Sequence, residues 1–140
     1  MQVELWGVLG SIACGGSAYA QYGGNTSCVA FRANGRVLIV DAGTGLRPLG
    51  EKLAAERHAS LSILLSHTHF DHVCGIPFFS PAYNPQCEVA IWSGHLRDGA
   101  AGATREVMDR LMEAPLFPVD PDVFRARLIY RDFVPGQDIE

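Results

Sequence analysis

Apolar and polar residues follow two different periods along this chain, and together the two periods predict a mixed α/β fold. Residues 3–10, VELWGVLG, resemble a strand, and the Gly- and Ser-rich residues 10–27 are expected to form a long loop. Two apolar runs within residues 28–43 flank Asn34 and Gly35. This dipeptide suits a type I′ turn because both of its residues accept positive φ angles. The segment is therefore predicted to be a β-hairpin.

Helical and extended patterns alternate after the hairpin. Leu46, Leu49 and Leu53 recur at helical intervals within residues 44–58, where Pro48 is tolerated if it lies in the first turn. The later pattern predicts strands at 61–66, 87–94 and 126–133, and a helix at 104–114 that ends before Pro115. This alternation of strands and helices favours the α/β class.

The last residues, VPGQDIE, contain a turn signal followed by what resembles the beginning of another strand. The chain has 140 residues, of which 48% are apolar, and this is enough for one modest core. No internal repeat or linker divides it. We therefore expect residues 1–140 to be the N-terminal part of a single domain.

Charge and cysteine content narrow the class of protein. Eleven basic against fifteen acidic residues argue against a nucleic-acid groove that works by bulk charge, although a local patch or a bound cation could still attract RNA. The four cysteines show no C-x-x-C spacing, so reduced thiols are expected. The N-terminus does not resemble a signal peptide, and no stretch approaches the ~20 apolar residues of a membrane span. These features predict a cytoplasmic protein without a membrane partner.

Three of the five histidines lie within residues 66–72, SHTHFDH. His67 and His69 are two residues apart where a predicted strand ends, and in extended backbone such side chains point to one side and can reach one cation. After Phe70 the chain is expected to turn into a short helix that directs Asp71 and His72 toward a second cation. Histidine with carboxylate suits Zn²⁺, with Mn²⁺ or Fe as alternatives. The alternative to a metal site is that these are three unrelated histidines in a polar loop.

Four further positions are candidates for substrate contact. Asn25, Thr26 and Ser27 could present amides and hydroxyls to a substrate phosphate, but a Gly-rich turn at the entry to a strand explains the same residues. His95 follows the predicted strand 87–94 and could contact substrate at the same edge of the sheet. A histidine on the surface after a strand is the alternative for His95.

The motif SHTHFDH matches the H-x-H-x-D-H signature of metallo-β-lactamase-fold hydrolases. The segments LWGVLGSI, YGGNTSC, LIVDAGTGLR and HVCGIPFF resemble the phosphodiesterase branch of that family, which includes tRNase Z and phosphoribosyl cyclic phosphodiesterase. The resemblance extends from about residue 5 to residue 79. It implies an αββα sandwich with two divalent metal ions at one edge.

The resemblance also implies a ligand set. His67 and His69 would bind the first metal, Asp71 and His72 would bind the second, and two more histidines and a bridging aspartate would complete the site. After His72 the sequence contains only His95, so the chain resembles the N-terminal half of such a domain. Because catalytic zinc normally takes at least three protein ligands, we expect the 140-residue chain alone to bind metal poorly and to be inactive.

Asp41 ends the second strand of the predicted hairpin. In the resembling family an aspartate at this position lies beneath the metal loop and orients a ligand by hydrogen bonding. The alternative is a cap on the following turn.

The resemblance implies hydrolysis of a phosphodiester by a metal-bridging hydroxide, with Asp71 and His72 as catalytic residues. A small cyclic nucleotide or cyclic sugar phosphate is the expected substrate, and RNA is a less favoured one. The oligomeric state is left open, with a homodimer as one alternative. Leu9 and Ala13 stand where relatives carry arginine and proline, which leaves the substrate open. The competing hypotheses are a thioester or lactam hydrolase on the same fold, and a non-catalytic degenerate metal-binding module.

Overall fold

The computed structural model describes residues 1–96 and 101–139. Its six-stranded sheet has the spatial order β1-β2-β3-β4-β5-β6. The strands are β1 (Gln2–Gly7), β2 (Cys28–Ala33), β3 (Arg36–Val40), β4 (Ser60–Leu65), β5 (Glu88–Ser93) and β6 (Arg127–Asp132). The first three strands pair antiparallel, and β3 to β6 pair parallel.

The helices connect the parallel strands. The α-helices are α1 (Leu46–Ala55), α2 (Phe70–Val73) and α3 (Ala103–Leu111). Short 3-10 helices are η1 (Ser17–Tyr19), η2 (Ile76–Phe78), η3 (Ser80–Tyr83) and η5 (Pro121–Val123). This mixed architecture confirms the predicted α/β class.

The local sequence signals correspond closely to the observed elements. Asn34 and Gly35 have φ angles of 51° and 75°, as the predicted type I′ turn between β2 and β3 requires. Two expectations were wrong. Helix α3 ends at Leu111, earlier than the expected limit at Pro115, and residues 137–139 form no strand. None of the described strands pairs with residues 137–139, and an extended segment without a neighbouring strand gains no ladder hydrogen bonds.

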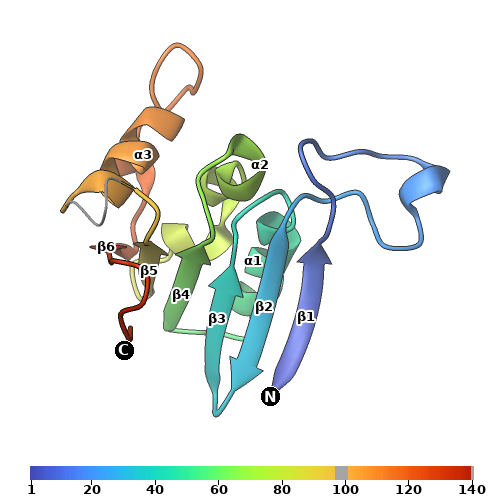
Figure 1. Ribbon diagram of the computed structural model, residues 1–140, viewed down its shortest axis with the longest axis horizontal. Helices are drawn as coiled ribbons and strands as arrows, with labels where there is room; N and C mark the ends of the chain where they lie inside the picture. The colour runs from blue at the N-terminus through green and yellow to red at the C-terminus, as the bar shows by residue number, and fades with distance from the viewer. Residues whose placement is uncertain (97–100, 140) are drawn as a thin grey trace.

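One face of the sheet carries the core. Helix α1 lies against this face, behind the sheet in Figure 1, and buries Leu46, Leu49 and Leu53 completely. Alternate residues of a strand point to the same face, so every second residue of the central strands joins this core. These buried residues are Ala30, Val37, Ile39, Leu61, Ile63, Val89 and Ile91.

The opposite face of the sheet is also apolar but is not covered by any described segment. The exposed fractions of Val3, Leu5 and Leu38 are 49%, 69% and 36%. Val3 lies in register with the half-buried Phe31, and Phe31 with Leu38, so these three residues form a continuous apolar row across three strands, and Leu5 lies two residues from Val3 on the same face. We call this surface the open sheet face.

The directions of the strands bring several loops to one edge. Strand β1 runs in the same direction as β3, β4 and β5, so the segments that follow these four strands all begin at the same edge of the sheet. Figure 1 shows α2 and the loop between β1 and β2 at this edge. The edge formed by the carboxyl ends of parallel strands is where α/β proteins commonly bind ligands. No helix in the described part of the chain is long and apolar enough to cross a membrane.

Candidate metal centre

The three histidines of the SHTHFDH segment lie together at this edge. The ring centroids of His67 and His69 are 4.5 Å apart, and those of His67 and His72 are 4.0 Å apart. His67 and His69 follow the end of β4, and His72 belongs to α2. The turn from strand to helix therefore gathers imidazoles that a longer strand would have separated.

Asp71 and His72 direct polar atoms toward each other. His72 Nε2 lies 3.4 Å from Asp71 Oδ2. Two ligands of one tetrahedral Zn²⁺, each at ~2.1 Å, are separated by about 3.4 Å. Asp71 Oδ2 also accepts a 2.7 Å hydrogen bond from Ser11 N–H, which holds the pKa of this carboxyl below its usual value. This nitrogen and this oxygen are thus spaced as a metal ion requires.

Asp41 lies beneath the histidines at the end of β3 and has a left-handed backbone, with φ of 63°. Its Oδ1 accepts hydrogen bonds from Ser66 N–H at 2.9 Å and Ser66 Oγ at 2.7 Å. Its Oδ2 accepts one from Ser27 Oγ at 3.0 Å and lies 2.9 Å from His72 Nδ1. Burial raises the pKa of Asp41, but the hydrogen bonds from Ser66 and Ser27 and the neighbouring His72 outweigh burial and leave it lowered. Asp41 is thus buried against His72 and the start of the SHTHFDH segment, and its orienting role toward a metal ligand stays a prediction.

His95 lies on the other side of the same cluster. Its ring centroid is 6.5 Å from that of His67. Its Nε2 is 3.1 Å from Thr68 Oγ1, and its Nδ1 is 3.1 Å from Ser93 Oγ. Burial, followed by the nearby His67 and His69, lowers the pKa of His95. Both ring nitrogens therefore contact hydroxyl groups, and the predicted substrate contact by His95 stays a prediction.

Asn25 and Thr26 support the turn beneath the metal loop. Thr26 is 1% exposed, and its Oγ1 accepts a 2.8 Å hydrogen bond from Thr44 N–H. Thr44 Oγ1 in turn donates to Asn25 Oδ1 at 3.1 Å. Gly43 packs so closely here that a Cβ would lie 2.3 Å from Asp71 O and from Thr26 Oγ1. The structure thus shows a buried structural contact for Thr26, and contact of either residue with substrate stays a prediction.

The described part of the chain does not hold a complete metal site. In residues 1–96 and 101–139, no group of three or more His, Cys, Asp or Glu side chains is arranged to hold one ion. The chemistry and spacing of His67, His69, Asp71 and His72 nevertheless fit divalent metals, because the donors are imidazoles and a carboxylate. These four residues would hold the metals, together with ligands from elsewhere.

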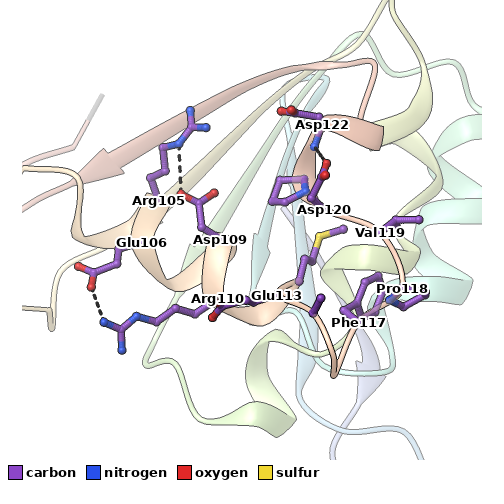
Figure 2. A pocket seen from close by; sticks show the side chains of 13 residues that line it. Arg105, Glu106, Asp109, Arg110, Glu113, Phe117, Pro118, Val119, Asp120 and Asp122 are labelled. Atoms are coloured by element: carbon purple, nitrogen blue, oxygen red, sulfur yellow. Dashed lines mark hydrogen bonds and ion pairs between the residues drawn. The ribbon is translucent and has the colours of Figure 1, made fainter.

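A separate hollow of about 920 Å³ lies between α3 and the segment that follows it. Figure 2 shows its charged lining, in which Arg105 pairs with Asp109 at 3.5 Å and Arg110 pairs with Glu106 at 2.7 Å. None of the predicted site residues lines this hollow. It is therefore distinct from the histidine cluster.

Ser27, a candidate for substrate contact, donates a hydrogen bond to Asp41, and its contact with substrate stays a prediction. Two other serines that contact the cluster were not singled out as site residues by the sequence. Ser66 precedes His67 and contacts both Asp41 and His67, and its place in the motif was a usable signal. Ser11 contacts Asp71 across sixty positions of sequence, and no local pattern signals such a contact.

Known proteins share this architecture. Residues 22–135 match the metallo-beta-lactamase superfamily, whereas no curated protein matches the chain. The metallo-beta-lactamase fold protein YhfI from Bacillus subtilis is similar in structure, with a TM-score of 0.64 and 20% identity, over 99% of this chain and 47% of that one. A diphosphatase from the PhnP family has a TM-score of 0.56 and 14% identity, over 92% of this chain and 49% of that one.

The chain spans about half the length of these two structures. At such low identity they show the fold, and they agree with the six-stranded sheet described above. The superfamily match covers most of the sequence, including the whole SHTHFDH segment. This chain therefore belongs to the metallo-β-lactamase superfamily and has its fold.

Proposed function

We propose that this chain forms part of a metal-dependent hydrolase of phosphodiester bonds, in which His67, His69, Asp71 and His72 hold two divalent ions, most favourably Zn²⁺. The observation that carries the proposal is the convergence of three imidazoles and one carboxylate at the ligand-binding edge of the sheet. The superfamily match supports the general class of metal-dependent hydrolase.

In this proposal the residues of this chain bind the metal ions and orient the side chains that hold them. When bound, the two ions would supply positive charge and a hydroxide that is available near neutral pH. His67 and His69 would share one ion, and Asp71 and His72 the other. Asp41 would hold the His72 ring through Nδ1, from which it is 2.9 Å away. In this proposal Asp71 and His72 are the catalytic residues.

A small cyclic nucleotide or cyclic sugar phosphate is the proposed substrate. Its negative charge matches a site in which two dications exceed the charge of the carboxylates around them. The fold neighbour described as a diphosphatase of the PhnP family provides a precedent for phosphorus chemistry on this fold. His95 and Asn25 are the proposed contacts at the rim, because the ring of His95 lies 6.5 Å from that of His67 and Asn25 lines a hollow together with Phe70 and Cys74. RNA remains the less favoured substrate.

The missing ligands are proposed to come from a second half of the same domain. Two observations support this: the described residues do not complete a metal site, and the open sheet face exposes Val3, Leu5 and Leu38. In an αββα sandwich a second sheet covers such a face. Residues 1–140 would then be the N-terminal part of that domain.

The test compares substrates on the longest natural form of the protein, loaded with Zn²⁺ or Mn²⁺. Bis(p-nitrophenyl) phosphate should be hydrolysed faster than nitrocefin or a glutathione thioester, and Asp71→Ala should abolish that hydrolysis. Faster turnover of nitrocefin or the thioester than of every phosphodiester tried would reject the substrate class. A protein that binds metal without any hydrolysis would favour a binding module.

A further inference from the structure

A chain of hydrogen bonds links Asp41 to His67 through the hydroxyl group of Ser66. Asp41 Oδ1 lies 2.7 Å from Ser66 Oγ, and Ser66 Oγ lies 3.1 Å from His67 Nδ1. An ionised carboxylate only accepts hydrogen bonds, so the Ser66 hydroxyl must donate its proton to Asp41. The oxygen of Ser66 then has only lone pairs to offer to His67.

This arrangement determines which nitrogen of His67 carries the proton. Because Ser66 can only accept from His67, the hydrogen bond requires a proton on Nδ1. The lone pair of Nε2 is then free to bind a metal. The same carboxylate lies 2.9 Å from His72 Nδ1, but without the geometry of a hydrogen bond, so the argument applies to His67 alone.

We infer that Ser66 is a positioning residue: its hydroxyl links Asp41 to His67, so the buried carboxylate of Asp41 fixes the tautomer of His67. Asp41 is 5% exposed and is further held by Ser27 Oγ at 3.0 Å. Its own left-handed backbone, φ 63°, directs the carboxylate into this position. The Ser66 contact itself does not depend on the proposed function, but its consequence for metal affinity rests on that function.

The chain offers a matched set of variants. Ser66→Ala removes the hydroxyl that joins Asp41 to His67, and Ser66→Thr retains a hydroxyl. Ser27→Ala also removes a hydroxyl donor from Asp41, but Ser27 is not bonded to His67. An effect that comes only from the loss of a hydrogen bond to Asp41 should therefore appear in both alanine variants. An effect that comes from the link between Asp41 and His67 should appear only in Ser66→Ala.

The tautomer can be read directly from the ¹⁵N signals of the His67 ring in metal-free protein at about pH 8, where an ordinary histidine is neutral. The parent, Ser66→Thr and Ser27→Ala should carry the proton on Nδ1. Ser66→Ala should shift His67 toward the Nε2–H tautomer. A parent with the proton on Nε2, or a tautomer that is unchanged in Ser66→Ala, would overturn the inference.

The Zn²⁺ affinity of the longest natural form of the protein and of its variants, measured by competition with a chelator, tests the consequence for metal binding. Ser66→Ala should weaken binding about 10-fold, the lower end of the effect expected for such a partner, because Ser66 is exposed and water can replace its hydroxyl in part. Ser27→Ala should weaken it less, and equal losses would overturn the link to the metal. If the parent binds no Zn²⁺, the proposed function fails and the tautomer measurement still decides the Ser66 contact.

Discussion

Asp71 and Asp41 lie on either side of His72, and their contacts indicate different roles. Asp71 Oδ2 is 3.4 Å from His72 Nε2, the nitrogen expected to bind metal, whereas Asp41 is 2.9 Å from Nδ1. Asp71→Ala should remove a direct ligand and its charge, so Zn²⁺ should no longer bind at that position at any practical concentration. Asp41→Asn should lower the affinity by about 10–100-fold and be rescued by added metal.

Zn²⁺ titrations of the parent and both variants, followed by bound metal per chain, check this assignment. Circular dichroism provides the control, because Asp71 is half-buried but lies outside the hydrophobic core, so its loss should leave the fold intact. An Asp41→Asn protein that no concentration of Zn²⁺ restores, beside an Asp71→Ala protein that behaves like the parent, would invert the two roles.

Ser11 holds Asp71 through its backbone. Its φ of 67° is in the left-handed region, which serine adopts at a cost, and this conformation directs its N–H to Asp71 Oδ2 at 2.7 Å. Ser11→Gly keeps the N–H and accepts the backbone, so the Zn²⁺ affinity should stay within about threefold. Ser11→Pro removes the donor and cannot adopt the positive φ, so affinity should fall by about 10-fold or more.

The control for Ser11 is a double-mutant cycle with Asp71→Ala, measured by Zn²⁺ competition. If Ser11 acts through Asp71, then Ser11→Pro should have no further effect once Asp71 is alanine. An equal loss from Ser11→Pro in both backgrounds would show that the loop acts by another route.

At the scale of elements, Asp132 at the end of β6 caps helix α3. Its carboxylate accepts hydrogen bonds from Gly102 N–H at 2.7 Å, Thr104 N–H at 2.8 Å and Thr104 Oγ at 2.6 Å. These satisfy N–H groups that the first turn of a helix leaves unpaired. Burial alone would raise the pKa of Asp132, but the hydrogen bonds from Thr104 and Gly102 lower it overall.

Asp132→Ala should therefore reduce the free energy of unfolding at pH 7 by about 1–2 kcal/mol. A carboxyl whose folded pKa is depressed stabilises fully above its unfolded pKa of about 3.9, and this stabilisation is lost as the pH falls through the folded value. The difference from the parent should therefore shrink as the pH falls below about 3.9. Asp109→Ala, which removes an exposed pair with Arg105 at 3.5 Å, is the control and should cost less than about 0.5 kcal/mol. Equal losses at pH 7 in denaturant unfolding would contradict the capping role.

The elements themselves could be predicted where the signal is local. The Asn34-Gly35 turn, the Leu46-Leu49-Leu53 stripe of α1 and the short helix after Phe70 each follow from neighbouring residues, and the structure confirms them. Contacts between Ser11 and Asp71 or between Asp132 and α3 depend on tertiary packing across 28 to 60 positions. Such contacts require the order and direction of the strands, which periodicity does not supply.

At the scale of the whole molecule, the open sheet face governs behaviour in solution. Val3, Leu5 and Leu38 expose apolar surface that water does not favour, so the 140-residue chain should self-associate as its concentration rises. Leu5→Lys with Leu38→Lys should shift sedimentation toward the monomer. Leu116→Lys replaces a side chain that is 91% exposed away from this sheet and is the matched control. Equal dissociation by the control would contradict a role for this face.

The most direct measurement of the metal cluster is a Zn²⁺ titration of the 140-residue chain, followed by the ¹⁵N signals of all five histidine rings. We expect weak binding that shifts the signals of His67, His69 and His72, whereas His58, which pairs with Glu56 at 3.0 Å, serves as the internal control. In Asp71→Ala the shift of His72 should be lost and the shifts of His67 and His69 should remain. Shifts confined to His58 or His95, or no shift of His67 and His72 at saturating Zn²⁺, would contradict the assignment of this cluster as a metal centre.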